Sequence, residues 1–136
     1  MTQLANFSHA ANVYRTAAAA VSPLAGVVML YDGVIAELSR TIVSLQEKKR
    51  DEAFNHLDRA TTILRGLCHN LDFERGGSFA ERMRDTYVRL ILSALNCFSK
   101  PDAVAQLAKL IDGITDLRNA WADVRIQQMK AGASKA

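Results

Sequence analysis

The residues of this chain that could bind a metal ion are its histidines and cysteines, and their spacing does not favour a shared site. His9, His56 and His69 lie in different parts of the sequence, and only Cys68 and His69 are adjacent. Neighbouring residues of a helix point about 100° apart, so these two side chains cannot easily share one ion. A di-metal site in a helical bundle needs Glu-x-x-His on two helices, and the sequence has no such motif. We therefore expect no metal and no cofactor.

The sequence also lacks the patterns of nucleophilic catalysis and of phosphate binding. Covalent catalysis requires a nucleophile beside a base and an orienting group, and neither Cys68 nor Cys97 has an evident base. There is no Gly-x-Ser-x-Gly, and Gly76-Gly77 does not have the spacing of a phosphate loop. The carboxylates of Asp51-Glu52 fall at a predicted helix corner, where solvent keeps them ionised. We predict that the protein is not an enzyme and that both cysteines are reduced, buried and structural.

The composition favours one helical domain. The chain has 136 residues, of which 49% are hydrophobic and 23% charged, with only 2 Pro and 7 Gly. Few turn residues favour long helices over a sandwich or a barrel, and the length suits a single domain over residues 1–136. No segment reaches the run of about 18 apolar residues that a membrane span needs. The apolar stretch 17–30 lacks the basic flank of a signal peptide, so we expect no membrane insertion and a location in the cytosol.

The net charge of +3 does not indicate a nucleic-acid partner. Basic residues are mixed with acidic ones, as in the run EKKRDE at residues 47–52. A nucleic-acid-binding protein concentrates Lys and Arg on one face, often with aromatic residues between them. We therefore interpret the run as a solvated corner between two helices and expect no nucleic acid as partner.

Apolar residues recur at steps of three and four through most of the chain, which predicts four long helices. These helices are expected at residues 22–46, 51–71, 78–98 and 101–130. Short corners between helices of this length favour an all-α fold, an antiparallel four-helix bundle. Residues 1–21, called the N-terminal segment below, have no clear period. We predict that this segment is weakly structured, with a helical turn around residues 12–20.

Local signals support the predicted helix ends. Ser22 and Pro23 have the residue types of an N-cap and a first helical position. Ser78 and Glu81 have the spacing of a capping box. The glycines at 76–77 can adopt positive φ at low cost and so mark the corner before that helix.

The first predicted helix carries more apolar surface than one packing face requires. A surface helix needs an apolar stripe of about 100°, whereas the apolar residues here surround most of the helix: Leu24, Val27, Val28, Met29, Leu30, Tyr31, Val34 and Ile35. Another part of the chain or a partner must cover the excess.

Two aromatic residues leave a similar choice open. Trp121 is either core or the lining of a binding groove, and Tyr14 either pins the N-terminal segment to the helices or is offered to a partner.

A series of short motifs runs in order along residues 12–125: Tyr14 with Thr16, Ser22-Pro23-Leu24, Met29-Leu30-Tyr31-Asp32-Gly33, Leu67, Leu71-Asp72, Gly76-Gly77, Tyr87, Ala94 with Asn96, and Leu117-Arg118-Asn119-Ala120-Trp121. Their order and spacing resemble those of the FliS family of flagellar secretion chaperones. The chain departs from the usual family residues at Thr41, His69 and Arg75, and Val88 stands where a second aromatic residue often follows Tyr87. These departures concern the details of a binding groove rather than the fold.

The resemblance implies that the protein binds the C-terminal segment of flagellin in apolar grooves of the bundle. It implies further that the protein prevents premature polymerisation and brings its cargo to the flagellar type III export apparatus, where an export-gate component is a second partner. In the family the N-terminal segment covers part of the groove when no cargo is bound, which places Tyr14 in the cover. With Tyr14, the expected partner-binding residues are those of the first helix: Leu24, Val27, Val28, Leu30, Tyr31, Val34 and Ile35.

The alternative hypothesis is a structural or adaptor protein whose apolar excess is buried in a homo-oligomer. An exposed apolar patch of this size is unusual on a monomer. The chaperone hypothesis predicts a monomer or a weak homodimer, whereas a stable dimer that does not respond to flagellin would favour the alternative.

Overall fold

The computed structural model describes residues 13, 15–21 and 24–134, and the regular structure of these residues is entirely helical. Four long helices follow one another along the chain: α2 (Leu24–Gln46), α3 (Arg50–His69), α4 (Phe73–Cys97) and α5 (Ala103–Ser134). The prediction of an all-α fold is thus confirmed. Tyr14 and the predicted N-cap pair Ser22-Pro23 lie outside the described residues.

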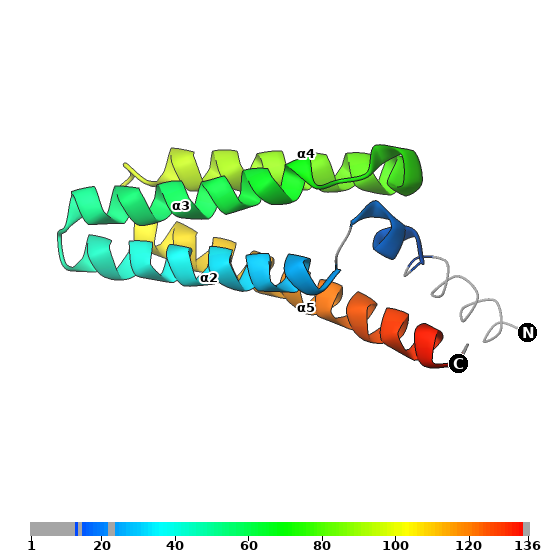
Figure 1. Ribbon diagram of the computed structural model, residues 1–136. Coiled ribbons are helices and arrows are strands. Elements are labelled where there is room, and N and C mark those ends of the chain that lie inside the picture. The colour runs from blue at the N-terminus through cyan, green and yellow to red at the C-terminus, as the bar shows by residue number, and fades with distance from the viewer. Residues whose placement is uncertain (1–12, 14, 22–23, 135–136) are drawn as a thin grey trace, which may run out of the picture.

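Successive long helices run in opposite directions, because each is joined to the next by a short corner (Figure 1). α2 packs between α3 and α5, and these two contacts are the most extensive in the structure. α4 also contacts α3 and α5, but less extensively. α4 therefore has the least extensive contacts with the other long helices.

The N-terminal segment is helical over residues 15–20. Its described residues, 13 and 15–21, lie at the end of the structure where α4 begins and α5 ends (Figure 1). The expectation of a weakly structured segment thus understates its packing, since Ala17 and Ala20 are buried. Their small side chains allow the segment to approach the long helices closely.

The corner between α3 and α4 differs from the predicted one. The side chain of Asp72 caps α4 by accepting a hydrogen bond from the Arg75 N–H at 3.0 Å. This cap starts the helix at Phe73, so one helical turn precedes the predicted start at Ser78. The chain then bends at Gly77, whose φ of 53° lies in the left-handed region that favours glycine.

Buried apolar side chains from all four long helices form one continuous core. The largest of them that are fully buried include Tyr31, Leu38, Leu57, Leu64, Tyr87, Leu107 and Ile114. Cys97 is buried and Cys68 is half-buried, and both are free thiols. Burial raises the pKa of the Cys97 thiol, which favours its uncharged form. None of the described helices has both the length and the apolar character to cross a bilayer.

Candidate functional site

α2 buries most of the apolar residues that the sequence analysis singled out on it: Leu24, Val27, Val28, Tyr31 and Val34. Leu30 and Ile35 are partly buried against the same core, and Met29 is 72% exposed. The chain itself therefore covers the apolar excess of α2. In this conformation the five buried residues are out of reach of a partner, and they become accessible only if a covering element moves.

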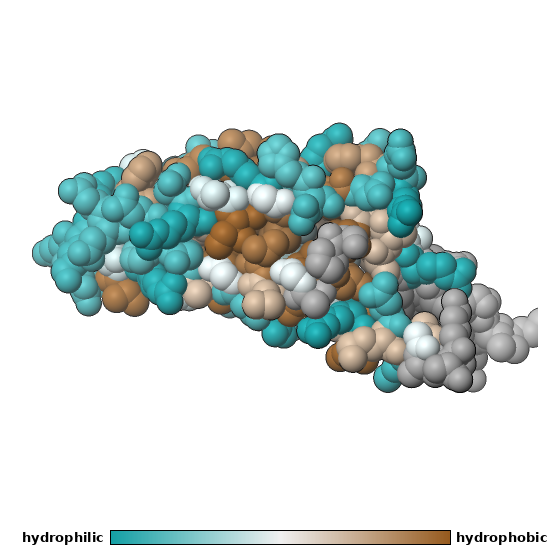
Figure 2. Space-filling model, viewed as in Figure 1, coloured by the Kyte–Doolittle hydropathy of each residue, from teal (hydrophilic) through white to brown (hydrophobic). Residues whose placement is uncertain are grey.

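Apolar surface remains visible where α2 meets α3. Figure 2 shows an apolar area in the middle of this face, bordered by hydrophilic residues. Gly33 of α2 lies against Ile63 of α3 at the junction of the two helices, and a Cβ atom at position 33 would be 3.3 Å from the Ile63 Cδ1. Ile63 is only partly buried. Because glycine has no side chain, position 33 allows α2 and α3 to approach each other closely.

The N-terminal segment is attached to the corner between α3 and α4. Ala17, Ala20 and Val21 belong to the buried core. The Ala20 carbonyl accepts a hydrogen bond from the Asp72 N–H at 2.8 Å. Gly76 lies so close to Ala20 that a Cβ atom at position 76 would be 2.7 Å from the Ala20 Cβ. One backbone hydrogen bond and one close contact that requires glycine therefore hold the segment at this corner.

An apolar pocket of about 250 Å³ lies between the N-terminal segment, α4 and α5. Its lining is mostly apolar and comes from all three elements: Val13 and Ala17, then Phe79 and Met83, then Leu117, Ala120, Trp121, Asp123 and Val124. The rings of Phe79 and Trp121 pack edge to face, with their centroids 6.0 Å apart. Trp121 is only 3% exposed. It is therefore a core residue that also forms part of the pocket wall.

Tyr31 of α2 and Tyr87 of α4 form a buried pair across the core. Their hydroxyl oxygens are 2.6 Å apart and share a hydrogen bond. Burial raises the pKa of Tyr31 to about 12, although hydrogen bonds with Tyr87 and Trp121 act in the opposite direction. Burial also raises the pKa of Tyr87, and the neighbouring Tyr31 raises it further. Both phenols are uncharged at neutral pH, and their hydrogen bond satisfies two polar groups inside an apolar core.

We expect this pair to limit stability in alkali. The pKa of Tyr31 and of Tyr87 lies above its ordinary value of 10.0. Each tyrosine therefore contributes its full stabilisation below pH 10, and the contribution is lost as the pH rises through the folded-state values. Phenolate absorbance followed together with helix content should show Tyr31 and Tyr87 ionising only as the helices unfold. Titration of all three tyrosines of the chain near pH 10, with the helices intact, would contradict this prediction.

Two polar pairs join α2 to its neighbours. The Glu37 carboxylate lies 2.7 Å from Nδ1 of His56 on α3 and accepts a hydrogen bond from Arg40 at 2.9 Å. Burial alone would raise the pKa of Glu37, but the hydrogen bonds and charges of His56 and Arg40 outweigh it, so that the pKa is lowered. Towards α5, Asp32 accepts a hydrogen bond from Nε of Arg118 at 2.8 Å. These pairs fix the orientation of α2 between α3 and α5.

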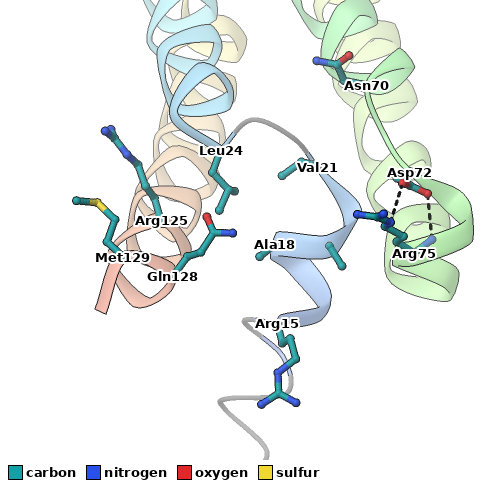
Figure 3. A pocket seen from close by; sticks show the side chains of 11 residues that line it. Arg15, Ala18, Val21, Leu24, Asn70, Asp72, Arg75, Arg125, Gln128 and Met129 are labelled. Atoms are coloured by element: carbon teal, nitrogen blue, oxygen red, sulfur yellow. Dashed lines mark hydrogen bonds and ion pairs between the residues drawn. The ribbon is translucent and has the colours of Figure 1, made fainter. Parts of the chain in front are cut away.

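A larger cleft of about 740 Å³, the end cleft, lies between the N-terminal segment, the start of α4 and the end of α5. Figure 3 shows Arg75 beside Asp72 on one side and the Gln128 amide directed towards the open space on the other. Arg15 and Arg125 also line it, from the N-terminal segment and from α5. Its floor includes Val21 and other small apolar side chains. The end cleft could not be predicted from the sequence, because its residues are far apart in the chain.

The sequence analysis also missed an exposed apolar stripe on α4, formed by Val88, Leu92 and Leu95. The sequence does contain the pattern, because these three apolar residues are spaced by four and then three positions, which places them on one helix face. It was overlooked because the buried stripe through Tyr87 and Ala94 runs beside it with the same period.

Among the described residues, no group of three or more His, Cys, Asp or Glu is placed to hold a metal ion. The described residues do provide apolar surface and a docked N-terminal segment that forms a wall of both the apolar pocket and the end cleft. These features define an all-helical protein whose apolar surface is partly covered by the described residues of its own N-terminal segment.

A family model for the flagellar protein FliS matches residues 6–128 of this chain. Because the match covers nearly the whole chain, the protein belongs to the FliS family. It is also similar to the flagellar secretion chaperone FliS of Campylobacter jejuni, with 28% identity over 105 residues, which cover 76% of this chain and 80% of that relative. The family predicted from the sequence motifs is thus confirmed.

Proposed function

We propose that the protein is a flagellar secretion chaperone that binds the C-terminal segment of flagellin in the cytosol. It prevents premature polymerisation of flagellin and delivers it to the flagellar type III export apparatus, where an export-gate component is a second partner. Membership of the FliS family and the name of the Campylobacter relative support this function. The chain acts as an antiparallel four-helix bundle with a groove that the N-terminal segment can cover.

The observation that carries the proposal is the apolar pocket beside Trp121. Val13 and Ala17 of the N-terminal segment form one of its walls, so that movement of the segment would open the pocket into a groove between α4 and α5. A flexible cargo loses conformational entropy when it binds, and a long apolar groove is needed to offset that cost. The limited contact of α4 with α5 favours such a groove.

In this proposal the candidate residues of α2 act at different stages. Leu30 and Ile35 are already partly exposed and can contact the cargo directly. The buried residues of α2 become accessible only after an element that covers them has moved: Leu24, Val27, Val28, Tyr31 and Val34. Leu24 supports this order, because it lines the end cleft together with Val21 of the segment. Tyr14 stays a candidate member of the cover.

Calorimetric titration of the protein with the C-terminal segment of flagellin from the same organism tests the proposal. We expect saturable 1:1 binding with a negative heat-capacity change, and circular dichroism should show a gain of helix as the cargo folds. Absence of heat and of helix gain, with the chaperone itself folded, would refute flagellin binding.

A matched pair of variants locates the groove. Ala120 is an exposed residue of α5 that lines the apolar pocket, whereas Ala105 is an exposed residue of the same helix outside it. Ala120→Asp should weaken binding of the flagellin segment by about tenfold or more, because a charge would be buried against apolar cargo. Ala105→Asp carries the same charge and should leave binding unchanged. Equal effects of the two variants would place the groove elsewhere.

The exposed stripe of α4 favours the second candidate function, a homo-oligomeric adaptor. Val88, Leu92 and Leu95 are 44%, 52% and 40% exposed, but a stable interface typically uses about 20–30 residues from each partner, far more than this stripe offers. We therefore expect only weak dimerisation in sedimentation equilibrium. Leu92→Glu should abolish it, whereas Val43→Glu, at an equally exposed position of α2, should not. A stable dimer that is insensitive to the flagellin segment would support the adaptor function instead.

A further inference from the structure

We infer that the end cleft is a second binding site, which takes an extended peptide segment bearing carboxylate side chains. The cleft has a volume of about 740 Å³, within the range of about 300–1,000 Å³ that ligand pockets typically have. It is separate from the apolar pocket beside Trp121, because no residue lines both. The N-terminal segment forms a wall of both, so that its movement would open the end cleft as well; the probes for the end cleft described below contain no flagellin sequence.

The charge of the end cleft indicates the chemistry of its ligand. Arg15, Arg75 and Arg125 come from three different elements, and Asp72 is the one acidic residue among the lining side chains. The Asp72 carboxylate is already engaged, since it caps α4 and lies 3.9 Å from Nε of Arg75. Among the described residues, Arg15 and Arg125 have no carboxylate partner. A ligand carboxylate can therefore pair with these guanidinium groups in a charge-assisted hydrogen bond.

The other lining residues favour a peptide over a nucleic acid. The floor of the end cleft is formed by small aliphatic side chains: Ala18, Ala19, Val21 and Leu24. No described aromatic residue lines it, whereas single-stranded nucleic acids are typically held by bases stacked on aromatic rings. The side-chain amides of Asn70 and Gln128 line the cleft as well, and each can both donate to and accept from a peptide backbone.

Two capped octapeptides serve as probes, one of alternating Glu and Ala and one in which Gln replaces every Glu. In a titration followed by backbone amide NMR, the Glu peptide should shift the signals of Ala18, Ala19 and Gln128 in a saturable way. The Gln peptide should bind about tenfold more weakly, because charge-assisted hydrogen bonds are roughly twice as strong as neutral ones. Raising the salt concentration should weaken only the Glu peptide, since salt screens exposed charges.

Three variants that each remove one positive charge test whether peptide binding depends on the arginines of the end cleft or only on the net charge of the protein. Arg15→Gln and Arg125→Gln should each weaken binding of the Glu peptide several-fold. Arg59→Gln removes the same charge from an exposed position of α3 outside the cleft and should have no effect. Equal affinity for the two peptides, or equal weakening by all three variants, would overturn the proposal. Tighter binding of a single-stranded oligonucleotide with the same arginine dependence would also overturn it. None of these outcomes bears on flagellin binding, which the Ala120→Asp variant tests separately.

Discussion

Replacing Trp121 with alanine is expected to lower the free energy of unfolding by about 3 to 5 kcal/mol, the range measured for large aromatic residues in cores. Trp121 is buried and packs edge to face on Phe79. Its removal thus enlarges the neighbouring pocket and takes away the ring contact of Phe79. Since domains of this size are stable by only about 5 to 15 kcal/mol in total, the loss should be plain in urea denaturation.

Two further substitutions make this prediction specific. Trp121→Phe keeps most of the ring volume, so it should lower the free energy of unfolding much less than Trp121→Ala does. Such a difference would assign the effect to packing. Met129→Ala truncates a side chain of the same helix that is 63% exposed, and it should change stability by less than about 0.5 kcal/mol. A Trp121→Ala variant as stable as the wild type would show that Trp121 is not a core residue.

The helices of this protein could be predicted from the sequence because their apolar residues repeat with the helical period. The bounds differ by a few residues where the ends depend on capping contacts. At the start of α4, Asp72 acts as the cap, and its residue type alone did not distinguish it from Ser78. The positive φ expected of the glycines at 76–77 is found at Gly77, but the bend that it makes lies inside α4 and not in the corner before it.

The faces of α2 could not be predicted, because its neighbours decide them. A helix with one neighbour buries one stripe, whereas α2 packs between α3 and α5. Val27 and Val28, adjacent in sequence and about 100° apart around the helix, are therefore both buried. The burial of the polar residue Thr41 could not be predicted from the sequence either. The residue is buried, and its hydroxyl donates to the Glu37 carbonyl at 2.8 Å, which satisfies it within the helix.

The candidate site depends on contacts between distant segments, and this is why the sequence indicated its residue types but not its geometry. Trp121 was predicted to be either core or groove, and the structure buries it in the core, where it also forms part of the wall of the apolar pocket. The end cleft was not predicted, since Arg15, Arg75 and Arg125 are separated by long stretches of chain. Such a group of charges becomes visible only when the fold brings three elements together.

Gly76→Ala is expected to release the N-terminal segment while leaving the four long helices folded. The added methyl group would lie 2.7 Å from the Ala20 Cβ and 3.1 Å from the Ala20 Cα. Overpacking of this kind typically costs about 1 to 3 kcal/mol, and the cost is relieved if the segment leaves the corner. Hydrogen exchange should accordingly quicken at the amides of residues 15–20 and at Asp72, whose N–H loses the Ala20 carbonyl.

If the segment covers the flagellin groove, its release should also raise the apparent affinity for the flagellin segment. Apparent affinity is reduced by the fraction of molecules that are covered, and each ~1.4 kcal/mol of destabilisation of the covered state corresponds to a factor of ten. We therefore expect Gly76→Ala to bind the flagellin segment about tenfold more tightly in calorimetry. Faster exchange of the segment without any gain in affinity would show that it is docked but does not cover the groove.

The control for Gly76→Ala is the same substitution at a glycine with free space around it. A Cβ atom at Gly66 of α3 would meet nothing within 4 Å. Gly66→Ala should therefore stabilise the protein by up to about 1 kcal/mol through helix propensity, without changing exchange or affinity. Adding Ala20→Gly to Gly76→Ala removes the closest clashing methyl group and should partly restore the slow exchange of residues 15–20. Failure of this rescue would mean that the contact with Ala80, 2.9 Å from the added methyl, distorts the bend of α4 instead of displacing the segment.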